Sequence, residues 1–125
     1  MARERRIAPD LRAPVIENAD VAVFELFAAQ VRGGGDMVIR DRTFRNCMLE
    51  GPAVVLVLQG TAFDGCDLGY ASGDSKNLLF RPVGERATGA IPFERCRFES
   101  CQFFAVGFTG SETVIRQLSQ VGDGG

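Results

Sequence analysis

Large apolar side chains recur every five residues in the C-terminal half of the chain, most clearly at Phe93, Phe98, Phe103 and Phe108. A period of five fits neither the period of about 3.6 of an α-helix nor the period of about 2 of a β-strand. It indicates a repeat that returns to an equivalent geometry every five residues, as in a square coil with one unit on each side. Four sides give a turn of about 20 residues, and successive turns stack about 4.8 Å apart.

The same spacing occurs earlier in the chain, in FRNCML (44–49) and FDGCDL (63–68). Each cysteine stands two places before a Leu or Phe of the repeat, which predicts that the cysteines line the corners of the coil; they are Cys47, Cys66, Cys96 and Cys101. Cys47 and Cys66 are 19 residues apart, which is close to one turn. We therefore expect them to lie one above the other.

Four short units carry this pattern best: CML (47–49), CDL (66–68), CRF (96–98) and CQF (101–103). In these units the sequence resembles pentapeptide-repeat proteins and related right-handed parallel β-helix proteins, over residues 39–108 at most. The resemblance implies an all-β fold, a small irregular right-handed parallel β-helix of about three coils with short N- and C-terminal capping helices. We place this β-helix at residues 37–110.

The repeat is interrupted after Phe63, because Phe93 follows 30 residues later instead of about 20. About ten residues must therefore leave the coil. The segments 70–77 and 84–89 have the Gly, Ser and charge content of such an excursion. Residues 51–60 differ again, since GPAVVLVLQG resembles a continuous buried strand.

Apolar residues at near-helical spacing predict an N-terminal capping helix at 21–31, with Asp20 as a candidate cap and the glycines at 33–35 as its end. The stretch VAVFELF (21–27) is equally compatible with an alternating β-strand. The N-terminal element is therefore either a helix or a strand.

Near the C-terminus, SETVIRQL predicts a helix at 111–119 that begins after Ser111 as N-cap. We expect residues 1–13 and 122–125 to be poorly ordered. The whole chain, 1–125, has the length of a single domain.

The composition excludes several function classes. The chain has no His, so it cannot use a Ser/His/Asp triad or an imidazole metal ligand. A net charge of −2 argues against the basic surface that a nucleic-acid binder needs. No apolar run is long enough for a membrane span. We therefore expect a cytoplasmic protein that binds neither nucleic acid nor membrane.

The four cysteines allow a disulfide, a metal site or a reactive thiol. Their spacings of 19, 30 and 5 contain no CxxC pair, which argues against a zinc ribbon. A disulfide between Cys47 and Cys66 is geometrically feasible if they stack, but cytosolic thiols stay reduced. The favoured interpretation is a buried ladder of free cysteines, without metal or cofactor.

Outward carboxylates of the predicted coils offer a possible enzyme site, since large β-helix enzymes act on polysaccharides with Asp or Glu. The candidates are Asp64, Asp67, Glu94 and Glu99. Three coils are short for a saccharide groove, so a minimal carbohydrate-active enzyme is an alternative only. The Gly-rich segments 33–36 and 106–113 match no phosphate-binding motif, because no basic residue follows them closely.

The excursion at 70–90 is the predicted binding surface, because irregular loops on a rigid scaffold commonly carry function. Its polar contributors are Tyr70, Asp74, Lys76, Arg81, Glu85 and Arg86. We expect a non-enzymatic interaction or scaffold module that binds a protein partner or a second copy of itself. The resemblance implies one further alternative, a nucleic-acid mimic, because some pentapeptide-repeat proteins mimic nucleic acid and bind topoisomerases.

Overall fold

The computed structural model describes residues 5–69, 79–80 and 89–123. In order along the chain, its elements are β1 (Val15–Glu17), β2 (Asp20–Ala22), α1 (Val23–Arg32), β3 (Ile39–Arg40), β4 (Thr43–Arg45), β5 (Met48–Val57), β6 (Ala62–Asp64), β7 (Leu79–Phe80), β8 (Ile91–Glu94), β9 (Arg97–Glu99), β10 (Gln102–Gly110) and α2 (Glu112–Asp123). The N-terminal apolar segment therefore contains both of the expected alternatives, a short strand followed by a helix.

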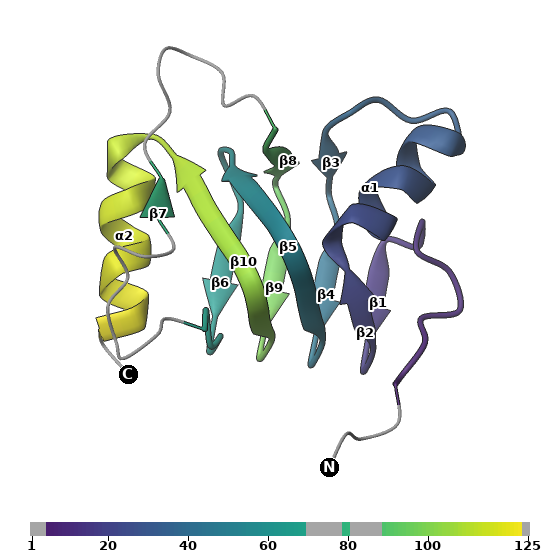
Figure 1. Cartoon of the computed structure of the whole chain (residues 1–125), viewed down its shortest axis with the longest axis horizontal. Helices are drawn as coiled ribbons and strands as arrows, with labels where there is room; N and C mark the ends of the chain where they lie inside the picture. The colour runs from purple at the N-terminus through teal and green to yellow at the C-terminus, as the bar shows by residue number, and fades with distance from the viewer. Residues whose placement is uncertain (1–4, 70–78, 81–88, 124–125) are drawn as a thin grey trace.

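The strands form two sheets that lie face to face (Figure 1). One sheet has four strands in the order β1-β4-β9-β6, and the other has six strands in the order β3-β8-β5-β10-β7, with β2 also paired to β5. Every strand pair within the described residues is parallel. Helix α1 lies beside β1 and β2, and α2 lies at the opposite side of the molecule, next to β6 and β7 (Figure 1).

The predicted all-β parallel β-helix is wrong. The described residues form a mixed α/β structure of two parallel sheets and two helices, and no sheet among them is closed or solenoid-like. The physical reason lies in β5 and β10, which continue for ten and nine residues where a five-residue repeat requires a corner. The strands are parallel, as expected, but nothing in the described residues is evidence for a pentapeptide-repeat fold.

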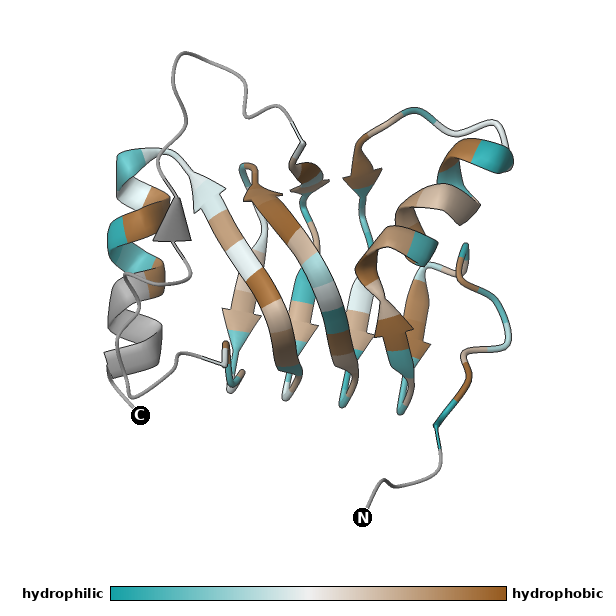
Figure 2. Cartoon of the chain, viewed as in Figure 1, coloured by the Kyte–Doolittle hydropathy of each residue, from teal (hydrophilic) through white to brown (hydrophobic). Residues whose placement is uncertain are grey.

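The repeat does mark the residues that fill the space between the sheets. Ile16, Phe44, Phe98 and Phe63 stand in register across the four-stranded sheet. The Phe98 ring stacks on Phe44 at 4.9 Å and on Phe63 at 5.0 Å between ring centroids. It also meets Phe103 of the other sheet edge to face at 5.3 Å. Figure 2 shows hydrophobic residues along the strands and hydrophilic residues at the turns of the lower edge.

Those turns share a left-handed residue after each strand of the four-stranded sheet. Asn18, Asn46 and Ser100 have φ values of 55°, 51° and 54°, and Gly65 has φ of 63°. Asn tolerates this conformation better than most residues with a side chain. The Asn46 side-chain amide also donates to Asn18 Oδ1 at 2.7 Å, which links two neighbouring turns.

The ends of the helices differ in how they are capped. Ala22 precedes α1 and makes no side-chain cap, while Asp20, expected to cap this helix, accepts hydrogen bonds from the main chain and the guanidinium of Arg6. These bonds hold the N-terminal segment against β2. At α2, Ser111 Oγ accepts from the main-chain N–H of Val114 at 3.2 Å, the geometry of an N-cap.

Candidate functional site

The residues predicted to bind a partner lie outside the described residues; they are Tyr70, Asp74, Lys76, Arg81, Glu85 and Arg86. Within the described residues, an apolar cavity lies at one edge of the four-stranded sheet. This cavity, formed by β5, β6 and α2, is the candidate site.

The two edge strands of the four-stranded sheet are covered differently. At the β1 edge, Ile16 is 4% exposed, and Leu11 and Ala13 of the preceding segment pack against the core. At the β6 edge, Phe63 holds the equivalent register position but is only partly buried. The row of apolar side chains formed by Ile16, Phe44, Phe98 and Phe63 is therefore covered at the Ile16 end and accessible at the Phe63 end.

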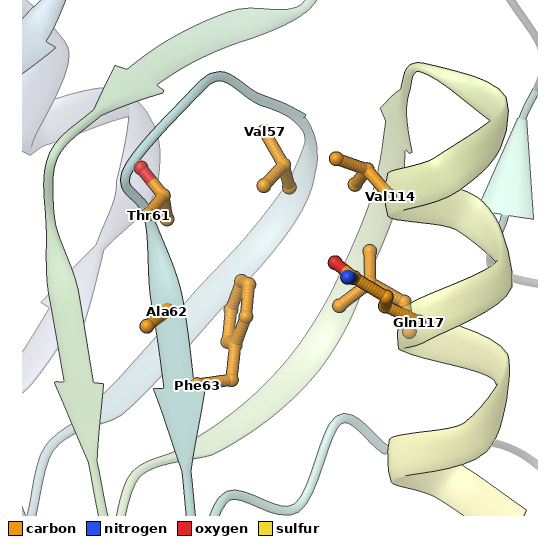
Figure 3. Close-up of a pocket in the computed structure, with 7 residues that line it drawn as sticks. Val57, Thr61, Ala62, Phe63, Val114 and Gln117 are labelled. Atoms are coloured by element: carbon orange, nitrogen blue, oxygen red, sulfur yellow. The ribbon is translucent and has the colours of Figure 1, made fainter.

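A cavity of about 250 Å³ adjoins Phe63. Its lining residues are Val57, Thr61, Ala62, Phe63, Val114, Gln117 and Leu118. Figure 3 shows the side chains of Val57 and Phe63 on the sheet side, facing Val114 and Gln117 on α2. Sites for drug-sized ligands usually occupy about 300–1,000 Å³, whereas an apolar cavity of about 150 Å³ already accepts benzene. The size therefore fits one aromatic or branched aliphatic side chain.

The polar groups of the cavity differ in availability. Thr61 Oγ1 donates to the Phe93 carbonyl at 2.8 Å and accepts from the Cys96 N–H at 3.3 Å, so its hydroxyl is already satisfied. Gln117 is exposed, and its side chain makes no hydrogen bond within the part of the chain that the structure describes. One amide at the rim of an apolar cavity can orient a bound chain.

The β6 strand beside the cavity is paired on one side only, as far as the described residues go. It pairs with β9 alone among the described strands. Ala62 N–H donates to the Cys96 carbonyl at 2.9 Å, and the Asp64 carbonyl accepts from the Ser100 N–H at 2.8 Å. Because alternate residues of a parallel strand bond to opposite neighbours, the main-chain N–H and C=O of Phe63 point to the edge that no described strand pairs with. An extended chain could pair there.

The predicted stacking of Cys47 directly on Cys66 is wrong. Cys47 follows β4 and Cys66 follows β6, but β9 lies between these two strands in the sheet. Cys101, which follows β9, therefore lies between Cys47 and Cys66. All four cysteines are free, and three are buried while Cys66 is partly exposed. Each thiol donates to a main-chain carbonyl of the neighbouring strand at 3.1–3.4 Å, as Cys101 does to Phe44. The four thiols are therefore packed at turns and hydrogen-bonded to the main chain.

The three neighbouring thiols influence one another. Hydrogen bonds with Cys47 and Cys66, and then burial, raise the pKa of Cys101. A hydrogen bond from Cys101 lowers the pKa of Cys66 to about 7. Cys101 has a single thiol hydrogen, so it favours the thiolate of one neighbour at a time. Burial raises the pKa of Cys96, which lies apart from this group. The same kind of hydrogen bond from Cys101 lowers the pKa of Cys47 to about 7, but Cys47 is buried and Cys66 is partly exposed. Exposure therefore makes Cys66 the more accessible of the two thiols.

Of the carboxylates proposed for carbohydrate chemistry, Asp64 and Glu99 are register partners on β6 and β9, whereas Glu94 and Asp67 lie at other positions. Glu94 and Glu99 each accept hydrogen bonds from two arginines, at 2.8–3.1 Å. Asp67 accepts from a main-chain N–H at 2.9 Å, and Asp64 is exposed on β6. Hydrogen bonds from Arg45 and Arg97 hold the pKa of Glu99 below its usual range, which does not suit a general acid.

One register column on the outer face of the four-stranded sheet mixes the two signs of charge. It runs Glu17, Arg45, Glu99 and Asp64, and Arg45 forms ion pairs with both glutamates, at 3.8 Å and 2.8 Å. A nucleic-acid mimic requires a continuous acidic stripe, which this column does not provide. Within the described ranges, no group of three or more Cys, Asp or Glu side chains is placed to hold a metal ion, and no helix is long and apolar enough to cross a membrane.

The cavity was missed from sequence because its residues lie up to 61 positions apart, from Val57 to Leu118. Two weak signals existed. Phe63 begins the interruption of the repeat, and Val114 and Leu118 form the apolar face of the C-terminal helix. Neither signal specifies that the two segments face each other.

No protein-family model matches this chain. No curated protein matches it, and no solved structure does either. The geometry of the site therefore carries the functional argument alone.

Proposed function

We propose that this chain is a non-enzymatic interaction module that binds an extended segment of a partner protein along β6. The observation that supports this is the edge of β6 that no described strand pairs with, beside an apolar cavity sized for one side chain. Strand addition uses these two elements together, since the main chain supplies hydrogen bonds and a pocket selects a side chain.

The expected affinity is modest. Burying one Leu or Phe side chain contributes about 1.5–3 kcal/mol, and the N–H and C=O of Phe63 offer two hydrogen bonds of about 0.5–1.5 kcal/mol each. Together they give about 2.5–6 kcal/mol before the cost of association, which corresponds at best to a dissociation constant of tens of micromolar. We therefore expect a transient contact, or a larger one in which this site is the anchor.

A library of ten-residue peptides displayed on phage, selected on the full chain, tests the proposal. We expect enriched peptides to share one large apolar residue within an otherwise β-prone stretch. Gln117→Trp places a ring at the mouth of the cavity and should weaken a selected peptide at least tenfold. Arg116→Trp adds the same ring at an exposed neighbouring position that does not line the cavity, and it should leave binding unchanged.

Strand pairing has a separate test in the peptide. Methylation of the main-chain nitrogens on the residues that face β6 should abolish binding, whereas methylation of the alternate residues should not. Equal effects of the two patterns, or selected peptides that bind Gln117→Trp as well as the unchanged chain, would contradict the proposal. If light scattering shows a dimer that Gln117→Trp dissociates, the partner is a second copy of this chain.

A further inference from the structure

A second cavity, of about 340 Å³, lies beside α1 and is polar. It is lined by Arg12, Gln30, Gly35, Asp36, Val38, Arg40 and Arg42. Three guanidinium groups therefore surround the space with a single carboxylate among the lining residues. Helix α1 and β3 lie on the opposite side of the molecule from α2 (Figure 1), so this cavity is separate from the one beside Phe63.

Arg42 is the unusual member of this group, because it is only 8% exposed. Its guanidinium donates to the main-chain carbonyls of Leu11 and Ala13 at 2.8 Å and 3.1 Å, and more weakly to Gln30 Oε1 at 3.4 Å. It forms no ion pair with any carboxylate of the described residues. A buried guanidinium is costly without a counter-charge, and burial lowers the pKa of Arg42 accordingly.

The other two arginines differ in their partners. Arg40 pairs with Asp36 at 2.5 Å and with Glu94 at 2.8 Å, so its charge is compensated. The Arg12 guanidinium donates to the Gly33 carbonyl at 3.2 Å and has no carboxylate partner within the described ranges. Arg12 and Arg42 thus bring two guanidinium groups to one cavity, and neither is ion-paired with a carboxylate among the described residues; Asp10 acts on Arg42 only through space.

The glycines that follow α1 make room for this arrangement. A Cβ on Gly33 would overlap with the Arg12 guanidinium, and a Cβ on Gly35 would lie 2.8 Å from Gln30 Cγ. The Gln30 amide also donates to the main-chain carbonyls of Asp36 and Val38, at 2.7 Å and 2.5 Å, which fixes the loop around the cavity. Arg40 and Arg42 follow the glycines in the same segment, whereas Arg12 comes from the N-terminal segment, so the set matches no sequential phosphate motif.

We propose that this cavity binds a phosphate group, either as free phosphate or as a small phosphate monoester. Two guanidinium groups with no ion-paired carboxylate among the described residues match the charge of about −1.5 to −2 that a phosphate carries at neutral pH better than the single charge of a carboxylate. Guanidinium forks also suit the paired oxygens of phosphate. The volume limits the organic part of an ester to a small group.

Calorimetric titration of the full chain with inorganic phosphate, phenyl phosphate and acetate, at constant ionic strength, tests this proposal. We expect binding of at least one phosphate compound and at least tenfold weaker binding of acetate. If only phenyl phosphate binds, the site takes an ester; if inorganic phosphate binds as well, it takes the free ion. Equal binding of acetate, or no binding of either phosphate compound, overturns the proposal.

Arg12→Gln is the informative variant, because this exposed side chain has no structural ion pair to lose. It should weaken phosphate binding at least tenfold, while Arg116→Gln, which removes an exposed arginine from α2 at the opposite side of the molecule, should not change it. In an NMR spectrum of the Arg side-chain Nε–H groups, phosphate should shift the Arg12 and Arg42 signals. Unchanged phosphate binding in Arg12→Gln, or no shift at Arg42, contradicts the assignment.

Discussion

Replacing Phe98 by Ala should destabilise the protein far more than replacing Phe63 by Ala, although both rings belong to the same row. Phe98 is 1% exposed and stacks on a ring on each side, at 4.9 Å and 5.0 Å between centroids. Phe63 has a parallel ring on one side only, Phe98, and tilted or edge contacts at 5.8 Å with Phe103 and Phe108. It is partly exposed and borders an existing cavity. The two substitutions delete the same atoms from different surroundings.

The magnitudes follow from this difference. Truncating a buried Phe to Ala costs about 3–5 kcal/mol, and each well-placed ring pair adds about 0.5–1.5 kcal/mol beyond its buried area. Phe98→Ala therefore lies at the upper end, near 5 kcal/mol, because neighbours on both sides prevent collapse. Phe63→Ala should cost about 2–3 kcal/mol, because the ring is partly exposed and already borders a cavity. We expect a difference of about 2 kcal/mol.

Urea unfolding followed by far-UV circular dichroism measures both values, since the chain has no Trp to report by fluorescence. With a slope of about 1–3 kcal/mol per molar urea, the two midpoints should differ by about 1–2 M. If Phe98→Ala does not fold, Phe98→Leu and Phe63→Leu should keep the same order. Equal losses at the two positions would refute the view that Phe63 lies at an accessible edge, and with it the basis of the proposed peptide site.

Three further results are expected. Gly51→Ala should lower the urea midpoint strongly, because its Cβ would overlap with the Ala105 carbonyl; Gly34→Ala, where no atom lies within 4 Å, should cost only about 1 kcal/mol for its positive φ. Hydrogen bonds from two arginines hold the pKa of Glu99 below its usual range, so Glu99→Gln should be less stable than the unchanged chain at pH 7. This difference in stability should disappear as the pH falls from about 4 through the lowered pKa of Glu99. A difference that does not depend on pH would contradict the assignment. In a titration of native protein with an aromatic disulfide, one thiol should react before unfolding and be absent in Cys66→Ser; four equally protected thiols would argue against the exposure of Cys66.

The sequence identified the inward residues well, because the direction of a side chain on a short strand is a local property. Phe44, Phe93, Phe98 and Phe108 are at most 1% exposed, as the repeat requires. Ser111 also caps a helix close to the place that was predicted. These features depend on a few neighbouring residues and therefore leave a readable pattern.

The order of the strands was not predictable in this way. The prediction from the repeat assumed that consecutive units stack on one another, which would place Phe63 directly beside Phe44 in the sheet. In the structure Phe98 lies between them, because β9 pairs with both β4 and β6. Strand order depends on contacts between residues more than 30 positions apart, about which a five-residue period says nothing.

Strand order also determines which side chains form the candidate site. In a sheet that followed chain order, β9 would be the edge strand and Phe98 would face α2, with Phe63 enclosed between two rings. Insertion of β9 reverses these roles: it encloses Phe98 and leaves Phe63 and the outer main chain of β6 at the edge. Helix α2, which packs on β10, then covers that edge only in part and leaves the cavity between Val114 and Phe63. The proposed peptide site is therefore a consequence of the non-local strand pairing that the five-residue repeat did not predict.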